Sequence, residues 1–563
     1  MLRIGIFFGG PAREREISFL GSKTTFAGLD QALFTPVPVF IDGRGNFILL
    51  DTKFMEAASL RDFYPPKSFL SEGKYPFRVY EESLNLTPEA EKAMIAEVGT
   101  RVYPHELKQY VDFAFLIVHG PQLEDGAIQG LLEWYGIPYY GSGLMGSGIG
   151  IDKIAQNELL QCTVGLKKRI YSLSKEQWDK TDKGVLFEEV KAQVGIPFVC
   201  KAPHQGSSIG VTFVRKDELE EFERSVRQSF FQLQITKAEW AAYNDEEKGK
   251  RLQRIANLDE GIAFPVVFNE GELIYHPQEL WEKLDTYFTQ TEQAAPLSSI
   301  HAEDAVLFES FVNGQEFSCG VIQDLDGNPL ALPPSEVIKE DDTTVFDFET
   351  KYLKNTTRKS IPIRTSLENN QKVHAQVKEV FHLFRFGACV RIDGFLTPEG
   401  DVILHDPNTL PGMSPASFIF KQMAEIGFNI TDSLTYFIRF SLRERIRTGK
   451  FTAVFRLLLA ELDRSIEQKN LRVKEKQEIL FEPTEAAFDA VKKQYNNLTS
   501  SATIQPVPVL NHPEEGKYTL DATHMAKATI PDLLSALHEP VHPLIEECRQ
   551  NAKQVTAFIT GII

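Results

Sequence analysis

Short apolar runs alternate with amphipathic stretches over the first 150 residues. Leu2–Phe8 is a mainly apolar run that ends at Gly9-Gly10, and Phe113–Val118 is another that ends at His119-Gly120. A helix is expected from about Arg13 to Leu29. Runs of this kind are typical of strands in a parallel sheet that helices cover on both faces. Because ligands bind at the carboxyl ends of such strands, the residues that follow both runs mark a candidate binding edge.

The middle of the chain continues the alternation but contains a long charged segment. Pro197–Lys201 and Ile209–Val214 are expected to form two strands joined by a Gly/Ser loop. Roughly residues 217–300 look largely helical and charged, and Trp240 and Trp281 indicate that this segment packs against the rest of the molecule. Further strands are expected at Ala305–Phe308, Glu316–Ile322, Cys389–Leu396 and Val402–Asp406.

The last part of the chain, from about residue 447, is again helical and charged, irregular around Pro506–Glu515 and then helical to the end. A chain of 563 residues is too long for one core. The pattern therefore predicts a multidomain α/β and α+β protein. We expect an α/β domain at 1–150, a central part at 151–308 with an insertion near 217–300, a third part at 309–446 and a mainly helical extension at 447–563.

Composition narrows the class of protein without indicating a reaction. The formal net charge is -18, and an acidic surface repels nucleic acid and anionic membranes at long range. The five cysteines include no CxxC pair, so we expect reduced thiols and not zinc ligands or disulfides. Neither a signal peptide nor a run of the ~18 apolar residues of a membrane span is found. We expect a cytoplasmic enzyme with no nucleic-acid and no membrane partner.

The densest group of polar side chains lies on two apolar strands near residue 400. Thr397-Pro398-Glu399-Gly400 suits a four-residue type I turn, which would pair Leu396 with Asp401. Carboxylates and an amide oxygen are ligands that magnesium prefers, and an arginine beside them would hold a phosphate or an oxyanion. A solvated hairpin face is the alternative interpretation. Because side chains alternate faces along a strand, the residues expected on one face are Arg391, Asp393, Asp406 and Asn408.

The Gly/Ser loop after Lys201 is a second candidate site. Gly206 and Gly210 let backbone amides approach a ligand closely, and Ser207 and Ser208 add hydroxyl donors. Lys201 at the strand end can reach a phosphate, although a plain hairpin loop is the alternative. The chain has no G-x-x-x-x-G-K-[ST] loop, no H-E-x-x-H and no G-x-S-x-G elbow. These absences argue against a P-loop NTPase, a zinc protease and a serine hydrolase.

Seven segments, in this order, resemble the motifs of D-alanine–D-alanine ligases, which are ATP-grasp enzymes. The resemblance runs from Met1 to about Ile446 and is interrupted by the insertion; the ordered set is specific, whereas no single motif is. The segments are Phe8-Gly-Gly-Pro-Ala-Arg-Glu-Arg-Glu-Ile-Ser, His119-Gly-Pro-Gln-Leu-Glu-Asp-Gly-Ala-Ile-Gln-Gly, Asp152-Lys153, Lys201 with Gly206-Ser-Ser-Ile-Gly, Glu309-Ser-Phe-Val with Glu316, Lys351-Tyr352, and Asn408-Thr-Leu-Pro-Gly-Met-Ser.

The resemblance implies an N-terminal substrate-binding domain, called pre-ATP-grasp, at 1–150. It implies an ATP-grasp fold with subdomains at 151–308 and 309–446, the second with the metal site. ATP and amino acids would be the substrates, with two magnesium ions, or manganese in their place. The resemblance also suggests a homodimer.

The resemblance assigns roles to single residues. Glu14 would hold the ammonium group of the first amino acid, and Arg391 would stabilise the tetrahedral intermediate. Ser207 and Tyr352 would complete the catalytic group. The implied ATP-binding residues are Lys153, Lys201, Ser208, Glu309, Val312, Glu316 and Lys351. His119 and Ser417 would bind substrate, Ser417 at the second carboxylate, and the implied metal ligands are Asp393, Asp406 and Asn408.

These roles imply ATP-dependent synthesis of a dipeptide through an acyl phosphate, with D-alanyl-D-alanine for peptidoglycan as the product. Tyr352 favours that product. Four residues depart from the family pattern and leave open a ligase for another amino-acid pair; Asp406 stands where a longer glutamate is usual. A non-catalytic nucleotide-binding regulatory protein is the third hypothesis, but the basic and acidic site residues argue against it. The departures are Leu123, Gln205, Asp406 and Phe418.

Overall fold

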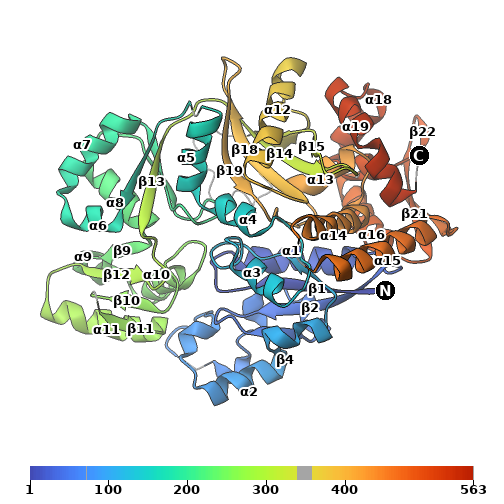
Figure 1. The fold of residues 1–563 in the computed structure, drawn as a ribbon. Helices are drawn as coiled ribbons and strands as arrows, with labels where there is room; N and C mark the ends of the chain where they lie inside the picture. Colours follow the sequence, from blue (N-terminus) through green and yellow to red (C-terminus); the bar gives the residue numbers. More distant parts are fainter. Residues whose placement is uncertain (71–72, 166, 270, 339–357, 450, 562–563) are drawn as a thin grey trace.

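The chain folds into several α/β layers around five sheets, within the residues that the computed structural model describes (Figure 1). These residues are 1–70, 73–165, 167–269, 271–338, 358–449 and 451–561. The expected multidomain α/β and α+β class is confirmed. None of the described helices combines the length and the apolar character needed to cross a membrane.

The N-terminal sheet has the order β4-β3-β2-β1-β5. β1 (Leu2–Gly9) pairs in parallel with β2 (Phe34–Ile41) and β5 (Phe113–Leu116), whereas β3 (Phe47–Leu50) and β4 (Gly99–Val102) pair antiparallel. The predicted parallel sheet is therefore present at the centre, with an antiparallel edge. The helices of this region are α1 (Arg15–Gly28), α2 (Pro88–Val98) and α3 (Ala127–Trp134), with 3₁₀ turns at Thr52–Glu56, Leu60–Asp62, Lys67–Phe69, Glu81–Leu84 and Pro104–Gln109.

The central sheet follows two linking helices, α4 (Leu144–Ile151) and α5 (Lys153–Thr163). Its order is β6-β13-β7-β8, all antiparallel. Its helices form the upper left of Figure 1. The strands are β6 (Ile170–Ser174), β7 (Phe198–Lys201), β8 (Val211–Val214) and β13 (Ala305–Ser310), and the helices are α6 (Lys175–Lys180), α7 (Lys183–Val194) and α8 (Leu219–Ser229).

The insertion has the expected helices, but it also contains a sheet of its own that the sequence analysis did not expect. Four antiparallel strands have the order β11-β10-β12-β9. They are only three to five residues long, too short to give a clear alternating pattern between charged helices. The elements are β9 (Gln232–Ile235), α9 (Lys237–Ala242), α10 (Asp245–Ala256), β10 (Val266–Phe268), β11 (Glu272–Ile274), α11 (Pro277–Gln290) and β12 (Ala295–Ser299).

The insertion packs against the N-terminal domain, as the two tryptophans indicated. Trp240 and Trp281 are buried and lie edge to face, with ring centroids 6.3 Å apart. Phe77 and Val79, from the N-terminal domain, belong to the same hydrophobic cluster. Figure 1 shows the insertion in light green beside the blue N-terminal domain.

The third sheet carries the predicted hairpin. Its order is β17-β16-β14-β18-β19, with β15 paired to β14. Helices α12 and α13 pack against it. The elements are β14 (Gln315–Gln323), β15 (Pro329–Ala331), β16 (Ser335–Ile338), β17 (Arg358–Ser360), α12 (Leu367–Leu383), β18 (Cys389–Leu396), β19 (Val402–Asn408), α13 (Phe418–Glu425) and α14 (Ile430–Arg447).

The extension is mainly helical, but the segment expected to be irregular around Pro506–Glu515 forms strands. β21 (Ile504–His512) pairs in parallel with β20 (Glu475–Phe481) and, from Val509 on, antiparallel with β22 (Gly516–Thr519). Pro506 and Pro508 lie where β21 has one strand neighbour only, so their missing N–H groups need not break a ladder. The helices are α15 (Thr452–Asn470), α16 (Glu485–Thr499), α17 (Ala522–Met525), α18 (Ile530–His538) and α19 (Pro543–Thr560).

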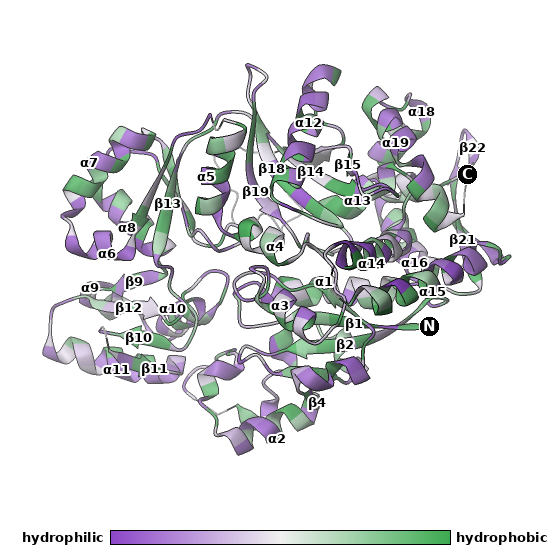
Figure 2. Ribbon diagram, viewed as in Figure 1, coloured by the Kyte–Doolittle hydropathy of each residue, from purple (hydrophilic) through white to green (hydrophobic). Residues whose placement is uncertain are grey.

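Helices α15 and α19 are part of the main hydrophobic core and not a detachable tail. Leu462, Ile466 and Leu544 belong to the cluster that also contains the residues of β1 and α14. Arg439 of α14 binds Asp463 of α15 with two N–H···O bonds of 3.0 Å. Figure 2 shows apolar and polar residues side by side along α15, as an amphipathic helix requires.

Replacing Ile466 by alanine is expected to lower the free energy of unfolding by about 2–5 kcal/mol, because its side chain is fully buried and would leave a cavity. Urea denaturation measures the change. Leu457 on the same helix is 72 % exposed, so Leu457→Ala is the matched control and should change the free energy by less than about 0.5 kcal/mol. Equal effects of both substitutions would show that α15 is not packed as described.

Candidate active site

One cavity of about 1090 Å³ gathers most of the predicted phosphate-binding and metal-binding residues. Its walls come from β7, β13, β18 and β19 and from the loop after β7. A cavity of this size suits a nucleotide-sized ligand. Lys351 and Tyr352 lie outside the described residues. The predicted residues that line the cavity are Lys153, Lys201, Ser208, Glu309, Val312, Glu316, Asp393 and Asp406.

Two lysines share Glu309 in the wall of this cavity. The ammonium groups of Lys168 and Lys201 each lie 2.6 Å from a different oxygen of Glu309. Burial alone would raise the pKa of Glu309, but the two cations outweigh it and hold this pKa well below its ordinary value. The group keeps a positive excess, which suits an anionic ligand. Lys168 was not predicted, because Lys167-Lys168-Arg169 reads as a solvated charge run.

Lys153 contacts both the Gly/Ser loop and Asp406, the predicted metal ligand on β19. Asp152 caps α5 by accepting from the backbone N–H groups of residues 154 and 155, which places Lys153 in the first helical turn. The Lys153 ammonium donates to the Gln205 carbonyl oxygen at 2.7 Å and lies 2.9 Å from Asp406 Oδ1. Burial disfavours this ammonium, but Asp406 outweighs burial and raises the pKa of Lys153. Burial alone would raise the pKa of Asp406, but Lys153 outweighs it and holds this pKa below its ordinary value.

The β18–β19 hairpin has a different register from the one expected. Thr397 N–H donates to the Asp401 carbonyl at 2.9 Å, and Gly400 has a left-handed φ of 83°, so the loop has three residues. Leu396 consequently pairs with Val402 and not with Asp401. The predicted turn over residues 397–400 is present, with Gly400 N–H donating to the Thr397 carbonyl at 2.9 Å. Only the pairing inferred from it was wrong, because it ignored the option of a glycine in the left-handed region.

The changed register alone would place Asp406 on the opposite face of the hairpin from Asp393. A β-bulge at Asp406 brings both side chains to the same cavity. Ile392 pairs with Pro407 and Asp393 with His405, so Asp406 is the extra residue, with a φ of 50°. Aspartate adopts this left-handed region more readily than most residues. Two consecutive side chains, His405 and Asp406, therefore line the same cavity as Asp393.

His405 is a site residue that the sequence analysis missed. Its ring stacks on Phe395 with centroids 5.0 Å apart. Among the described residues, neither ring nitrogen has a hydrogen-bond partner, and both are buried. Burial, followed by Lys201 and Lys168, lowers the pKa of His405 to about 3. The neutral imidazole of His405 can accept a hydrogen bond from a ligand at one ring nitrogen and donate one from the other, without adding charge.

Arg391 and Asp393 form a buried bidentate pair. The two N–H···O distances are 3.0 and 2.9 Å, and Ser318 Oγ donates to Asp393 at 2.7 Å. The Arg391 guanidinium also lies 5.8 Å from the Phe418 ring centroid. Asn408 pairs across the hairpin with Arg391, and its amide donates to the backbone carbonyl of Asp406. Of the four residues expected on one face, Asp393 and Asp406 line the cavity, and Arg391 and Asn408 adjoin them.

Glu14 contacts the Gly/Ser loop from the other side. Ser207 Oγ donates to Glu14 Oε1. Burial is the main cause of a raised pKa of Glu14, and Oε2 has no hydrogen-bond partner among the described residues. A Cβ at Gly206 would lie 2.7 Å from Oε2, so only glycine allows this approach. A cationic ligand group would satisfy the unpaired carboxylate oxygen.

His119 and Ser417, the two predicted substrate-binding residues, also carry unpaired buried atoms. Within the described part of the chain, His119 Nε2 and Ser417 Oγ have no hydrogen-bond partner. His119 Nδ1 lies 3.8 Å from Glu124; burial disfavours the imidazolium, but the carboxylates outweigh it and raise the pKa of His119. Ser417 is the N-cap residue of α13. Because buried polar groups are usually paired, these atoms mark positions where a polar ligand fits.

Arg13, next to Glu14, connects this site to the insertion. Its buried guanidinium donates to Ser299 Oγ at 2.9 Å and to the Leu258 carbonyl at 3.2 Å. It also stacks on Phe231, 3.7 Å from the ring centroid. The insertion therefore holds the backbone from which Glu14 projects. The sequence analysis placed Arg13 at a helix start, and no pattern in one sequence reveals so distant a partner.

His204 bridges two carboxylates beside the Gly/Ser loop. Its Nδ1 lies 2.8 Å from Glu303, and its Nε2 lies 3.8 Å from Asp152. Asp152 and Glu303 raise the pKa of His204 from 6.5 to about 10. A raised folded-state pKa stabilises the fold fully below the unfolded value and loses this effect as pH rises through the folded value.

His204→Gln should therefore lower the melting temperature most at or below about pH 6.5 and progressively less up to about pH 10. Thermal unfolding at about pH 6 and about pH 9 checks this, and the difference from wild type at the higher pH should be less than half of that at the lower. A difference that does not change with pH would mean that His204 is not held as an imidazolium.

Comparison with known proteins gives a consistent result. The family models "D-ala D-ala ligase N-terminus" and "D-ala D-ala ligase C-terminus" match residues 3–142 and 288–439, together about half of the chain. The chain is 26% identical over 447 residues to D-alanine--D-alanine ligase A of Chromobacterium violaceum, covering 79% of this chain and 96% of the relative. It is 23% identical over 442 residues to the D-alanine--D-alanine ligase of Natranaerobius thermophilus, covering 78% and 95%.

Two solved structures share the fold at low sequence identity. The D-alanine-D-alanine ligase from Coxiella burnetii has a TM-score of 0.50 and 19% identity, covering 80% of this chain and 97% of that one. The VanG D-Ala:D-Ser ligase from Enterococcus faecalis has a TM-score of 0.50 and 18% identity, covering 78% and 99%. Most of the insertion and the whole extension at 447–563 lie outside both family models.

Proposed function

Because the chain belongs to the D-alanine–D-alanine ligase family, we propose that it joins two D-alanine molecules into D-alanyl-D-alanine with ATP, for peptidoglycan synthesis. The cavity of about 1090 Å³ supports this proposal most. Its wall contains several lysines together with two carboxylates of the β18–β19 hairpin. This combination is suited to holding and activating a nucleotide triphosphate.

The proposed reaction has two steps. A carboxylate oxygen of the first amino acid attacks the γ-phosphorus of ATP, which releases ADP and leaves an acyl phosphate. The amine of the second amino acid then attacks the acyl carbon, loses a proton, and expels phosphate as the peptide bond forms. The first step is needed because a free carboxylate is a poor acceptor for an amine, and excluding water protects the acyl phosphate from hydrolysis.

The residues on the nucleotide side would bind and neutralise phosphate. Lys153 and Lys201 would hold phosphate oxygens, with Ser208 and, next to the γ-phosphate, Lys351. This role requires Lys153 to exchange its contact with Asp406, at 2.9 Å, for a ligand. The adenine and the ribose would lie against Glu309, Val312 and Glu316, all in the cavity wall.

The residues on the amino-acid side would orient the reacting groups. Glu14 would bind the first ammonium group through the oxygen that lacks a partner. Arg391 would stabilise the oxyanion of the tetrahedral intermediate. Ser417 would bind the second carboxylate, with His119, Ser207 and Tyr352 completing the site.

The donor set near the hairpin fits magnesium. Asp393 and Asp406 supply carboxylate oxygens in the cavity wall, and Asn408 adds an amide oxygen. Both carboxylates lie beside cations, Asp393 beside Arg391 and Asp406 beside Lys153. Burial alone would raise the pKa of Asp406, but Lys153 outweighs it and lowers this pKa, which favours the ionised form that a metal ligand needs. Bound magnesium or manganese would neutralise phosphate charge. Asp406 has one methylene fewer than glutamate, and the bulge brings its carboxylate into the cavity wall.

A ligase for another amino-acid pair is the second candidate. Leu123 is buried and packs against Gly10, where a Cβ would lie 2.5 Å from the Leu123 side chain. Phe418, next to Ser417, lies against Arg391. Leu123 and Phe418 depart from the family pattern and lie where the amino acids would bind. Their larger side chains favour a different amino acid in place of one D-alanine. The homodimer and the cytoplasmic location implied by the family stay predictions.

Phosphate release from ATP distinguishes these candidates. The assay measures phosphate with D-alanine alone, with D-alanine paired with each other D-amino acid or D-hydroxy acid, and with L-alanine as the control. Release with D-alanine alone supports the first candidate, and release only with a mixed pair supports the second. No amino-acid-dependent release with any pair would contradict both and leave the regulatory hypothesis.

A further inference from the structure

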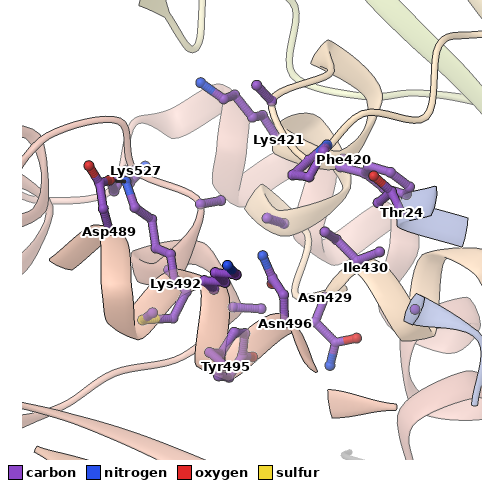
Figure 3. Close-up of a pocket in the computed structure, with 18 of the residues that line it drawn as sticks. Thr24, Phe420, Lys421, Asn429, Ile430, Asp489, Lys492, Tyr495, Asn496 and Lys527 are labelled. Atoms are coloured by element: carbon purple, nitrogen blue, oxygen red, sulfur yellow. Dashed lines mark ion pairs between the residues drawn. The ribbon is translucent and has the colours of Figure 1, made fainter. Parts of the chain in front are cut away.

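A second cavity, of about 570 Å³, lies between the family-matched part of the chain and the extension (Figure 3). Residues of α1, α13 and α14 form one side, and residues of α16, α17 and the segment 526–529 form the other. None of the described residues predicted for ATP, metal or amino-acid binding lines it. It is therefore separate from the site described above and depends on the extension for half of its wall.

Positive charge predominates in this cavity. Four lysines from α13, from α16 and from the segment after α17 line it, against two acidic residues among those described. This excess is unusual in a chain with a net charge of -18, and it makes the cavity a local attractor for anions. The lysines are Lys421, Lys492, Lys493 and Lys527, and the acidic residues are Glu485 and Asp489.

Two of these lysines are already neutralised by neighbours, and two are not. Lys492 lies 2.8 Å from Asp489, and Lys527 lies 2.6 Å from Glu425. Within the part of the chain that the structure describes, no ion pair or hydrogen bond engages the ammonium groups of Lys421 or Lys493. The unpaired groups are on opposite sides of the cavity, on α13 and α16.

Lys421 is held in an unfavourable environment. Burial, and then the charges of Lys492 and Lys527, lower its pKa, although Asp532 opposes this effect. A half-buried ammonium surrounded by other ammoniums gains from a nearby negative charge. An anion in the cavity would provide it.

The rest of the lining is apolar and aromatic. Phe420, Phe428 and Ile430 come from α13, its following loop and α14, and Met525 comes from α17. Figure 3 shows Phe420 and Ile430 on the same side of the cavity, with Lys492 and Tyr495 across from them. A ligand that fills this space has an apolar body as well as a charged group.

We propose that this cavity binds a small organic anion, whose phosphate or carboxylate group lies between Lys421 and Lys493 and whose apolar body packs on Phe420 and Ile430. This proposal does not depend on the reaction catalysed at the other site. The cavity is nevertheless close to it: Ser417 is the residue at the N-terminus of α13, and Lys421 follows one helical turn later.

Calorimetric titration of the full chain tests the proposal, with phenyl phosphate and phenylacetate as the two probes. Saturating AMP-PNP is present, so that a probe binding only in the larger cavity is excluded. At least one probe should bind with a stoichiometry of one, and whichever binds tells whether the site prefers phosphate or carboxylate. Lys421→Gln should weaken this binding at least about tenfold, the effect of losing one charge-assisted contact.

Two further variants separate binding from folding. Lys493 is exposed at the rim, so Lys493→Gln should weaken binding severalfold with an unchanged melting temperature. Lys476 is exposed on β20 outside the cavity, and Lys476→Gln should bind as wild type. The proposal is overturned if neither probe binds wild type, if AMP-PNP abolishes binding, or if the Lys421→Gln/Lys493→Gln double variant binds as tightly as wild type.

Discussion

Replacing Asp393 by asparagine is expected to lower kcat by about a thousandfold or more. Asparagine keeps the shape of the side chain and an acceptor for Arg391, but it removes the negative charge that the proposed magnesium site requires. The bidentate contact with Arg391, at 3.0 and 2.9 Å, makes asparagine a better test than alanine. Alanine would remove the carboxylate that contacts a buried guanidinium, at a cost of about 3–5 kcal/mol in stability.

The control for this variant is on the same hairpin. Asp401 lies at the end of the hairpin turn and pairs with Lys167, whose side chain is largely exposed. Asp401→Asn should keep kcat within about twofold of wild type, as expected for loss of a surface ion pair. Steady-state kinetics with thermal unfolding on both variants makes the comparison. Near-normal turnover of Asp393→Asn, or a similar loss in both variants, would contradict the metal assignment.

Glu14→Gln is expected to raise the KM for the first amino acid by about a hundred- to five-thousandfold and to leave the KM for ATP unchanged. The glutamate is buried, and its Oε2 has no partner among the described residues. Losing one member of a buried charged pair costs about 3–5 kcal/mol, which corresponds to this change in affinity. Kinetics with each substrate varied in turn measures the two KM values separately.

Glu16→Gln is the matched control for this effect. Glu16 lies two residues further on and accepts hydrogen bonds from Leu60 N–H and Ser59 Oγ, away from the Gly/Ser loop. Its replacement should change stability but not the amino-acid KM. If both variants raised the KM for ATP as strongly as that for the amino acid, Glu14 would be a structural residue of the cavity and not an ammonium-binding group.

Eight strands could be predicted from the sequence because each is a compact apolar run with a clear end, whereas the core strand β2 was missed. Cys389–Leu396 has the predicted bounds, and most others differ by only a few residues at their ends. The short strands of the insertion and the proline-containing β21 were missed. In both cases pairing with distant segments decides the structure, and a local pattern carries little information about such pairing.

In the candidate site, too, features set by a local pattern could be predicted, and features set by distant partners could not. Lys153, Lys201, Asp393 and Asp406, which the motifs indicated, line one cavity in the structure, but the predicted hairpin register was wrong. A single left-handed glycine and one bulge changed the pairing while keeping the carboxylates in place. His405, Lys168 and Arg13 were missed because each acquires its position from partners far away in the sequence, such as Ser299 for Arg13.

The central claim is that ATP activates an amino-acid carboxylate as an acyl phosphate. D-Alanine labelled with ¹⁸O in its carboxylate, incubated with ATP and the enzyme, tests it most directly by mass spectrometry of the inorganic phosphate released. The account predicts that each phosphate released with dipeptide carries one labelled oxygen, because the carboxylate oxygen that attacks phosphorus leaves with it. Dipeptide formation with unlabelled phosphate, or phosphate release that does not depend on an amino acid, would contradict the account.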